Sequence, residues 1–374
     1  MKALLEPIKE IARFDELFRD LKKGTTGVTV ISGCLESQKA HMIAGLSEDA
    51  PVRLLIAENE LKAKELYEDY RLYDAETLYY PAKDLIFYQA DIHGNLLIRQ
   101  RLQVIQALLE RKEVTIITSV GGCMDFLLPL DVFEKHCIHL RNDSELDLDK
   151  IRKELVRLGY ESTFQVESTG QFSVRGGILD IYPLTEQNPI RIELWGDEID
   201  SIRSFDAQSQ RSLENLDEIM IYPAAEQPIE KGEVTFIDYF KDGDSMLFLD
   251  ELNHLEENAK AVEEEFQQSC RNRQEKGETT LSGNWMCSWE ELCKKLNRRN
   301  CIGLSLLDPR KSGWKITGQF NLTVKSMNSY QSSFELLVKD LKQYKKEGYR
   351  IVLLSGSRTR AERLAKDLQD EGLS

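Results

Sequence analysis

The sequence has no long apolar run, and its first ten residues, MKALLEPIKE, contain no apolar stretch of the kind that a signal peptide carries. A membrane-spanning helix needs about 20 predominantly apolar residues, and a secretory signal peptide needs an apolar core near the N-terminus. We therefore expect no membrane partner and a cytoplasmic location.

Cysteine is sparse, with 7 in 374 residues, and no two cysteines form a C-x-x-C pair. An odd number of scattered thiols indicates reduced cysteines rather than a disulfide framework or a zinc site. The densest group of metal-ligand types is His136-Cys137-Ile138-His139. Its alternation predicts a half-buried strand in which the two histidines straddle the thiol, so we expect no metal ion there.

Positive charge is also in short supply, since 49 lysines and arginines face 64 aspartates and glutamates, and the formal net charge is −15. A nucleic-acid backbone is neutralised by clustered Lys and Arg side chains. We expect any contact with DNA to need a local patch or another chain.

A length of 374 residues exceeds what one hydrophobic core usually organises, so at least two domains are expected. The first 130 residues alternate apolar strands with helical patterns, the rhythm of a parallel sheet with helices on its faces. The predicted strands are 28–32, 52–57 and 114–119, and the predicted helices are 60–72 and 96–109.

A helix is predicted at 147–158. After it, the alternation of apolar strands with helices gives way to a different residue pattern. The runs FSVRGGILDIYPL and PIRIELWGDEIDSIRSF alternate and are joined by Gly, Pro and Asn, which predicts a small antiparallel sheet that interrupts the first domain. The alternation of strand and helix patterns resumes at about Glu233, and it ends with a strand, turn and helix over 349–368. Because the chain stops directly after this unit, we expect a longer protein. The other predicted elements are a strand in SMLFLDEL, helices at 255–276 and 333–347, and short strands around 302–307 and 318–324 within a stretch, 277–325, whose fold the pattern leaves open.

The segment VTVISGCLESQKAHMIAGL, residues 28–46, has the outline of a phosphate-binding loop. The motif G-x-x-x-x-G-K-[ST] needs glycines so that backbone amides approach the phosphates, a lysine for charge, and a hydroxyl for magnesium. Gly33 and Lys39 match, whereas Gln38 and Ala40 replace the second glycine and the hydroxyl residue. We therefore expect neither ATP nor Mg²⁺ to bind, and we favour a strand-to-helix turn kept for folding over a site of magnesium-dependent hydrolysis.

The strand SMLFLDEL ends in Asp250 and Glu251. An acidic pair at this place resembles the carboxylates that hold magnesium and orient water in an NTPase. It is equally consistent with a solvated strand end, and without a hydroxyl at position 40 the pair has little to cooperate with.

The third candidate lies between residues 171 and 211. Arg175 precedes a Gly-Gly turn, and Arg191 and Trp195 lie four apart on one predicted strand, hence on one face. Arginine beside a large aromatic is typical of a protein-binding hot spot. The pattern leaves open the alternative that Trp195 belongs to the core and that the arginines are simply solvated.

Several stretches of the sequence together resemble one family. They are FSVRGGILDIYP, RIELWGDEIDSIRSFDAQSQRS, IYPAAE, YYPAKDLIFYQADIHGNLLIRQRLQVIQALLERKEVTIITSVGGC and SMLFLDELNHLEENAKAVEEEF. These motifs are similar to the nucleotide-excision-repair module shared by UvrB and the bacterial transcription-repair coupling factors (Mfd), and they are closer to the latter. An intact phosphate loop and a long aromatic hairpin before the helix at about Asn95, both typical of UvrB, are missing. The resemblance covers most of 10–270 and 330–374.

The resemblance implies an α/β fold: a degenerate RecA-like helicase lobe with an inserted small sheet-rich domain like UvrB domain 2, plus the start of a further α/β domain. The domains it implies are the first part of the lobe (domain 1a, 1–137), a UvrA-binding domain 2 (138–226), a further lobe that is the remainder of the UvrB-like module (domain 1b, 227–328), and a domain-3-like start (329–374).

The function that the resemblance implies is a scaffold that recruits UvrA in transcription-coupled repair, with no catalytic residues of its own. Its UvrA-binding residues are Arg175, Arg191 and Trp195, where a related protein has Phe in place of Trp195. RNA polymerase and DNA would be contacted through parts of the family protein outside this chain, where the translocase motor also lies. The alternative is an ATP-dependent DNA helicase or excision-repair enzyme of the UvrB type.

Overall fold

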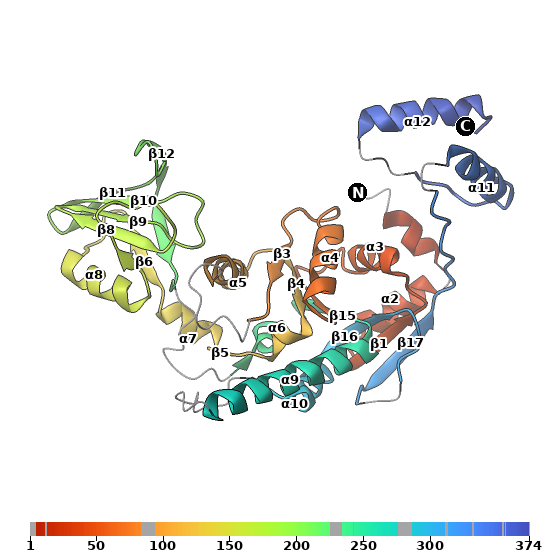
Figure 1. Ribbon diagram of the computed structural model, residues 1–374, viewed down its shortest axis with the longest axis horizontal. Helices are drawn as coiled ribbons and strands as arrows, with labels where there is room; N and C mark the ends of the chain where they lie inside the picture. Colours follow the sequence, from red (N-terminus) through yellow and green to blue (C-terminus); the bar gives the residue numbers. More distant parts are fainter. Residues whose placement is uncertain are drawn as a thin grey trace. The chain divides into compact units, whose positions relative to one another are not determined.

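The computed structural model describes residues 5–11, 13–83, 94–224, 234–241, 243–275, 286–310, 313–330, 333–353, 355 and 357–373. The chain forms two compact units, residues 1–323 and 324–374. The first unit contains an α/β lobe and a sheet-rich insert (Figure 1).

The lobe is built on a seven-stranded sheet of order β17-β1-β16-β15-β2-β4-β3, in which every neighbouring pair is parallel. β1 and β4 are buried at every position, which explains their continuous apolar runs. The strands predicted at 28–32, 52–57 and 114–119 are confirmed. The strands are β1 (Gly27–Ser32), β2 (Val52–Ala57), β3 (Leu78–Tyr80), β4 (Val114–Ser119), β15 (Ser245–Asp250), β16 (Asn300–Ser305) and β17 (Ile316–Asn321).

The strands that follow the insert complete this sheet. β15 lies between β2 and β16, and β1 lies between β16 and β17. Residues 227–328 were expected to form a further lobe, but β15, β16 and β17 belong to the sheet of the first one. The physical reason is that β15 and β16 are apolar strands buried on both faces, and each needs a neighbour on both edges for its backbone groups.

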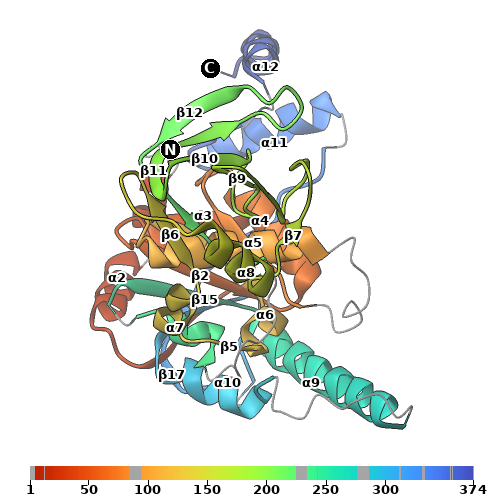
Figure 2. The same cartoon turned by 90° about the vertical axis from the view of Figure 1, so that its left-hand side faces the viewer.

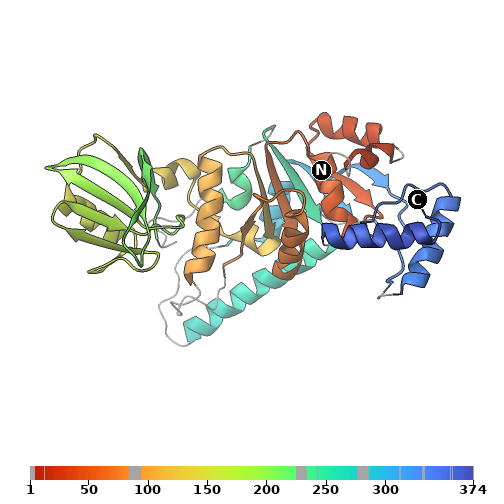
Figure 3. The ribbon, with the colours of Figure 1, turned by 90° about the horizontal axis from the view of Figure 1, so that it is seen from above.

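Helices cover both faces of the sheet, as Figure 1 shows for α3 and α4 on one side and α9 and α10 on the other. The long helix α9 (cyan) also stands out in Figure 3. Alternate strand residues serve the two cores: Leu54 and Ile56 face one, and Leu55 and Ala57 face the other. The first core includes residues of η2 (Phe236–Tyr239), α5 (Gly94–Leu109), α6 (Val120–Met124), α9 (Leu252–Glu275) and α10 (Trp289–Leu296), and the second includes residues of η1 (Glu6–Glu10), α2 (Phe14–Lys22), α3 (Glu36–Leu46) and α4 (Glu60–Tyr70).

The insert contains a six-stranded sheet of order β12-β11-β10-β9-β8-β7 and a two-stranded sheet, β13-β6. Its helix α8 (Leu148–Arg157) packs on the apolar face of the larger sheet, and Figure 2 shows α8 against these strands. β8 to β12 pair antiparallel, as predicted, because their polar and apolar residues alternate. The strands are β6 (Ile138–Arg141), β7 (Glu161–Ser162), β8 (Gln171–Arg175), β9 (Ile178–Ile181), β10 (Ile190–Trp195), β11 (Glu198–Phe205), β12 (Ser212–Leu216) and β13 (Glu218–Ile221).

Two short elements join the insert to the lobe, β5 (Phe126–Leu127), which pairs with β14 (Val234–Thr235), and α7 (Leu130–Lys135). The strand predicted over residues 136–139 begins only at Ile138. His136 is the C-cap of α7, and Cys137 lies between this cap and the strand.

The second unit contains α11 (Phe334–Lys346) and α12 (Arg358–Asp370), which share a small core of Val338, Leu341 and Leu368. The strand predicted at the start of 349–368 is wrong for the described residues 349–353 and 355, which are irregular. A strand needs a paired neighbour for its backbone groups, and the described part of this unit offers none. Across all described residues, no helix is long and apolar enough to cross a membrane.

Candidate functional site

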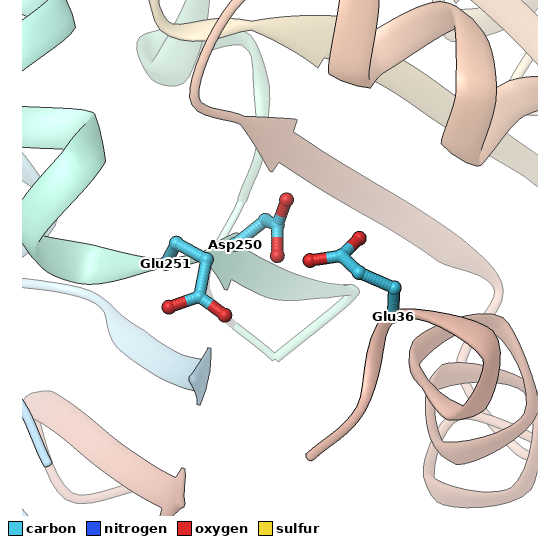
Figure 4. Close-up of side chains that lie close together, drawn as sticks. All are labelled: Glu36, Asp250 and Glu251. Atoms are coloured by element: carbon cyan, nitrogen blue, oxygen red, sulfur yellow. The ribbon is translucent and has the colours of Figure 1, made fainter. Parts of the chain in front are cut away.

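The carboxyl ends of β1 and β15 bring together four charged side chains, which we call the lysine cluster: Glu36, Lys39, Asp250 and Glu251. The Nζ atom of Lys39 lies 2.5 Å from Asp250 Oδ1, 2.6 Å from Glu36 Oε1 and 3.0 Å from Glu251 Oε1. Figure 4 shows the three carboxylates, Glu36 at the start of α3 and the other two at the end of β15. This edge of a parallel sheet is where open α/β folds bind ligands.

Within the described part of the chain, these three carboxylates form the one group of His, Cys, Asp or Glu side chains close enough to share a metal ion, with ligand atoms within 4.8 Å of one another. The buried ammonium of Lys39 contacts all three of them. It therefore supplies the positive charge that such a group requires. Because Asp250 is buried, the pair Asp250 and Glu251 is not a solvated strand end.

The charges of the cluster shift two pKa values. Burial lowers the pKa of Lys39, but the attraction of Asp250, Glu36 and Glu251 outweighs it and leaves that pKa raised. Burial raises the pKa of Asp250 to about 6 against the pull of Lys39, and the two other carboxylates add to the rise. The two shifts have different main causes: three carboxylates hold the proton on the lysine, whereas burial disfavours the charged form of Asp250.

The backbone of the phosphate-loop segment is bonded to the protein itself. The Gly33 and Cys34 amides donate to the carbonyls of Leu306 and Ser305, each at 3.1 Å. Gly33 has a φ of +78°, and a Cβ atom there would lie 2.3 Å from the carbonyl oxygen of Leu322. The close approach of Leu322 therefore requires glycine at this position, independently of any phosphate.

The two positions that differ from the phosphate-loop motif, Gln38 and Ala40, are also part of the folded lobe. The methyl group of Ala40 is buried in the second core, and Gln38 lies in the first turn of α3. The cavity beside Lys39 and Asp250 has a volume of about 10 Å³, which is the room of roughly one water molecule. Both positions are therefore part of the packed strand-to-helix turn.

The second candidate lies on the face of the insert's sheet that points away from α8, which we call the outer face. Arg191 and Asp180 are directly opposite each other on β10 and β9. Arg191 binds this carboxylate through two bonds, Nε to Oδ1 at 2.7 Å and Nη2 to Oδ2 at 2.9 Å. Arg175 donates from Nη2 to the same Oδ2 at 2.8 Å. One buried aspartate therefore positions both arginines.

Arg191 is held on its other sides as well. Its guanidinium lies 4.4 Å from the ring centroid of Phe205, and Nη2 donates to Gln210 Oε1 at 2.9 Å. The hydrogen bond to Asp180 raises the pKa of Arg191. The side chain is 15% exposed, whereas that of Arg175 is 40% exposed. Arg175 is thus the arginine that more readily reaches a partner.

Trp195 ends β10 and is 84% exposed, so the interpretation of this residue as part of the core is wrong. It faces Glu198 across the tight turn that begins at Gly196, whose φ is +67°. A ring of this size left in water is typical of an interaction surface.

Comparison with known proteins places the insert in a family. The family model of the UvrB interaction domain matches residues 138–226. The transcription-repair-coupling factor of Bacillus subtilis (strain 168) is 25% identical over 95% of this chain and 36% of its own length. That of Staphylococcus aureus (strain USA300) is 35% identical over 63% of this chain and 20% of its own length. The chain is homologous to the transcription-repair-coupling factors.

In this homologue of the coupling factors, the matched stretch holds β6 to β13 and therefore the whole outer face. The chain spans 36% or less of the length of these two relatives. Its RecA-like lobe and sheet-rich insert agree with the predicted fold class.

Sequence reasoning missed two members of these sites. Glu36 could have been found, because it precedes Lys39 by three residues on a helix and such residues are neighbours. Asp180 follows an apolar run in β9, and its role depends on pairing with β10 and β8, which the pattern alone does not specify.

Proposed function

We propose that this chain is the UvrA-recruiting scaffold of a transcription-repair coupling factor in transcription-coupled nucleotide-excision repair, and that UvrA docks on the outer face. One observation carries the proposal: within the matched interaction domain, an exposed tryptophan shares a face with two arginines that a buried carboxylate holds in place. Preorganised arginine and aromatic side chains lose little entropy on binding and dominate the energetics of protein interfaces.

The proposal assigns contacts with RNA polymerase and DNA to portions of the coupling factor outside this chain. It also assigns no ATP hydrolysis to the lobe. In support, Lys39 is bound by three carboxylates, the loop amides of Gly33 and Cys34 bind carbonyls, and position 40 has no hydroxyl. The rival function, an ATP-dependent helicase of the UvrB type, needs these same groups for phosphate and magnesium.

A nucleotide titration separates the two functions. With Mg²⁺ present, a fluorescent ATP analogue is expected to show no saturable binding up to about 1 mM, the upper end of ordinary enzyme affinities. A working phosphate-loop ATPase titrated alongside provides the positive control. Micromolar binding that disappears when Lys39 is replaced by alanine would favour the rival function.

The docking surface is tested by truncating its two accessible residues. Arg175→Ala and Trp195→Ala are each expected to weaken UvrA binding by about 2 kcal/mol, roughly 30-fold in Kd. Isothermal titration calorimetry with purified UvrA measures the change, and circular dichroism checks that the fold is retained. Arg191→Ala is a poorer test, because Arg191 is the less exposed arginine and makes two of the three bonds from these arginines to the buried carboxylate of Asp180, whereas Arg175 makes one.

The matched control is Arg157→Ala, since Arg157 is an exposed arginine on α8, the helix that packs on the opposite face of the sheet. Its affinity for UvrA is expected to equal that of the parent. If Arg175→Ala and Trp195→Ala bind UvrA as tightly as the parent and the control, the outer face is not the docking surface.

A further inference from the structure

A second aromatic side chain lies exposed on the insert. Phe164 follows β7 and is 83% exposed, nearly as much as Trp195. Its backbone is anchored, because the carbonyl of Phe164 accepts a hydrogen bond of 2.9 Å from Ser173 Oγ on β8. The neighbouring Thr163 is held too, since its amide donates to the carbonyl of Phe172 at 2.9 Å. The ring is therefore presented by a fixed segment of backbone.

Phe164 is coupled to the outer face through Arg175. The guanidinium carbon of Arg175 lies 5.8 Å from the centroid of the Phe164 ring, within the range of a cation–π contact. The same guanidinium is tied to Asp180. Aspartate on one side and phenylalanine on the other thus restrict the arginine to one orientation.

Arg175 in turn lies at the same end of the sheet as Trp195. Arg175 is opposite Ile178, and Ile178 is opposite Glu193, two residues before Trp195 on the same face of β10. The turn that follows Arg175 is bonded to this end of β10, since the Leu194 amide donates to the Gly177 carbonyl at 2.9 Å. Phe164, Arg175 and Trp195 therefore form one row, which we call the docking row.

The charges near the row indicate the chemistry of the partner. Asp180 carries one negative charge against the two positive charges of Arg175 and Arg191, and Arg203 is matched by Glu193. Glu198, opposite Trp195, adds a third negative charge, so these arginines and acids balance in number. The more exposed of the two arginines bound to Asp180 is Arg175, so its guanidinium is the one open to a carboxylate of a partner. A complementary partner surface offers a carboxylate flanked by apolar recesses.

We propose that Phe164 is a further contact residue of the UvrA-docking surface, so that UvrA sets a carboxylate on Arg175 and encloses the rings of Phe164 and Trp195 on either side. This inference rests on the proposed function and deepens it. It assigns to the interface a residue of the loop before β8, outside the strands that carry the arginines and the tryptophan.

The test measures UvrA affinity by calorimetry for Phe164→Ala, Phe164→Tyr and a control, Val156→Ala, with the whole chain. Val156 is an exposed apolar residue on α8, on the other side of the sheet. Phe164→Ala is expected to weaken binding about tenfold, the scale of an interface anchor, with an unchanged melting temperature because the ring is exposed. Phe164→Tyr keeps the ring and is expected to stay within about twofold of the parent, as is Val156→Ala.

A double variant, Phe164→Ala with Arg175→Ala, tests whether the two side chains act together in binding UvrA. Because the two side chains contact each other, their combined loss is expected to be smaller than the product of the single losses. If Phe164→Ala binds UvrA like the parent while Trp195→Ala binds weakly, this inference is overturned and the proposed function stands. If the parent itself does not bind UvrA, the proposed function fails. If Phe164→Ala changes only the self-association of the chain in sedimentation, the row is an interface between copies and the inference is wrong.

Discussion

Replacing Lys39 by methionine is expected to lower the free energy of unfolding by about 3–5 kcal/mol near neutral pH, the usual cost of removing one partner from a buried ion pair. Methionine keeps the length and apolar stem of the side chain, so the substitution removes the ammonium with little loss of packing. Glu36, Asp250 and Glu251 then share one region without a counter-charge. Urea unfolding followed by circular dichroism measures the loss, and hydrogen exchange in α3 and β15 assigns it to the cluster.

The pH dependence of this loss follows from Asp250. Its pKa, raised by burial from 3.8 to about 6, is higher in the folded than in the unfolded chain. A carboxyl whose pKa is raised by folding adds to the free energy of unfolding at low pH. For Asp250 this contribution is complete below pH 3.8 and is lost as the pH rises through 6. The ammonium of Lys39 lowers the pKa of Asp250, so its removal raises this pKa further. The stability contributed by Asp250 is then lost over a range that extends to higher pH. The Lys39→Met variant is therefore expected to be least stable relative to the parent near about pH 8 and to approach it near about pH 5.

The control for this experiment is Lys294→Met. Lys294 pairs with Glu290 on the surface of α10, and such a pair contributes at most about 1 kcal/mol. Equal unfolding midpoints for the parent, Lys39→Met and Lys294→Met at pH 8 would show that the lysine cluster does not stabilise the lobe.

Asp180→Asn is expected to destabilise the insert by about 3 kcal/mol and to weaken UvrA binding by more than about tenfold. The amide has the shape of the carboxylate, but it lacks the charge and turns an NH₂ group toward guanidinium donors. Arg175 and Arg191 would lose the charged acceptor that they share. Their guanidinium groups would then no longer be held in one orientation on the docking surface. Hydrogen exchange in β9 and β10 reports the stability, and calorimetry with UvrA reports the binding.

Glu193→Gln is the matched control, because Glu193 lies on the same face and its pair with Arg203 is half-buried rather than fully buried. It is expected to cost less than about 1 kcal/mol in stability. Should Asp180→Asn and Glu193→Gln behave alike in both measurements, Asp180 does not position the arginines.

The elements of the fold were largely predictable from the sequence. β1, β2 and β4 were found because buried parallel strands are continuous apolar runs, and α4 and α5 because their apolar residues recur with helical spacing. The strand predicted near Tyr349 failed for a different reason. Its residues suit a strand, but pairing requires a neighbour, and a local pattern does not reveal whether one is present.

The candidate sites were predictable only as lists of residues. Gly33, Lys39 and Asp250 stood out by motif and position, yet the sequence left open whether Lys39 faces phosphate, solvent or protein. Lys39 and Glu251 are 212 residues apart, and their contact exists because β15 returns to the sheet after the whole insert has been completed. Interactions between segments so distant in sequence leave no periodic signal.

The sequence by itself determined which segments form strands and helices, the sheet-rich insert with its family motifs, and the absence of a hydroxyl at position 40. Only the tertiary structure decided that Trp195 is exposed, that Asp180 joins two arginines, and that Lys39 is bound by three carboxylates. The physical reason is that side-chain type limits what a residue tolerates, whereas its exposure and partners depend on which distant segments pack against it.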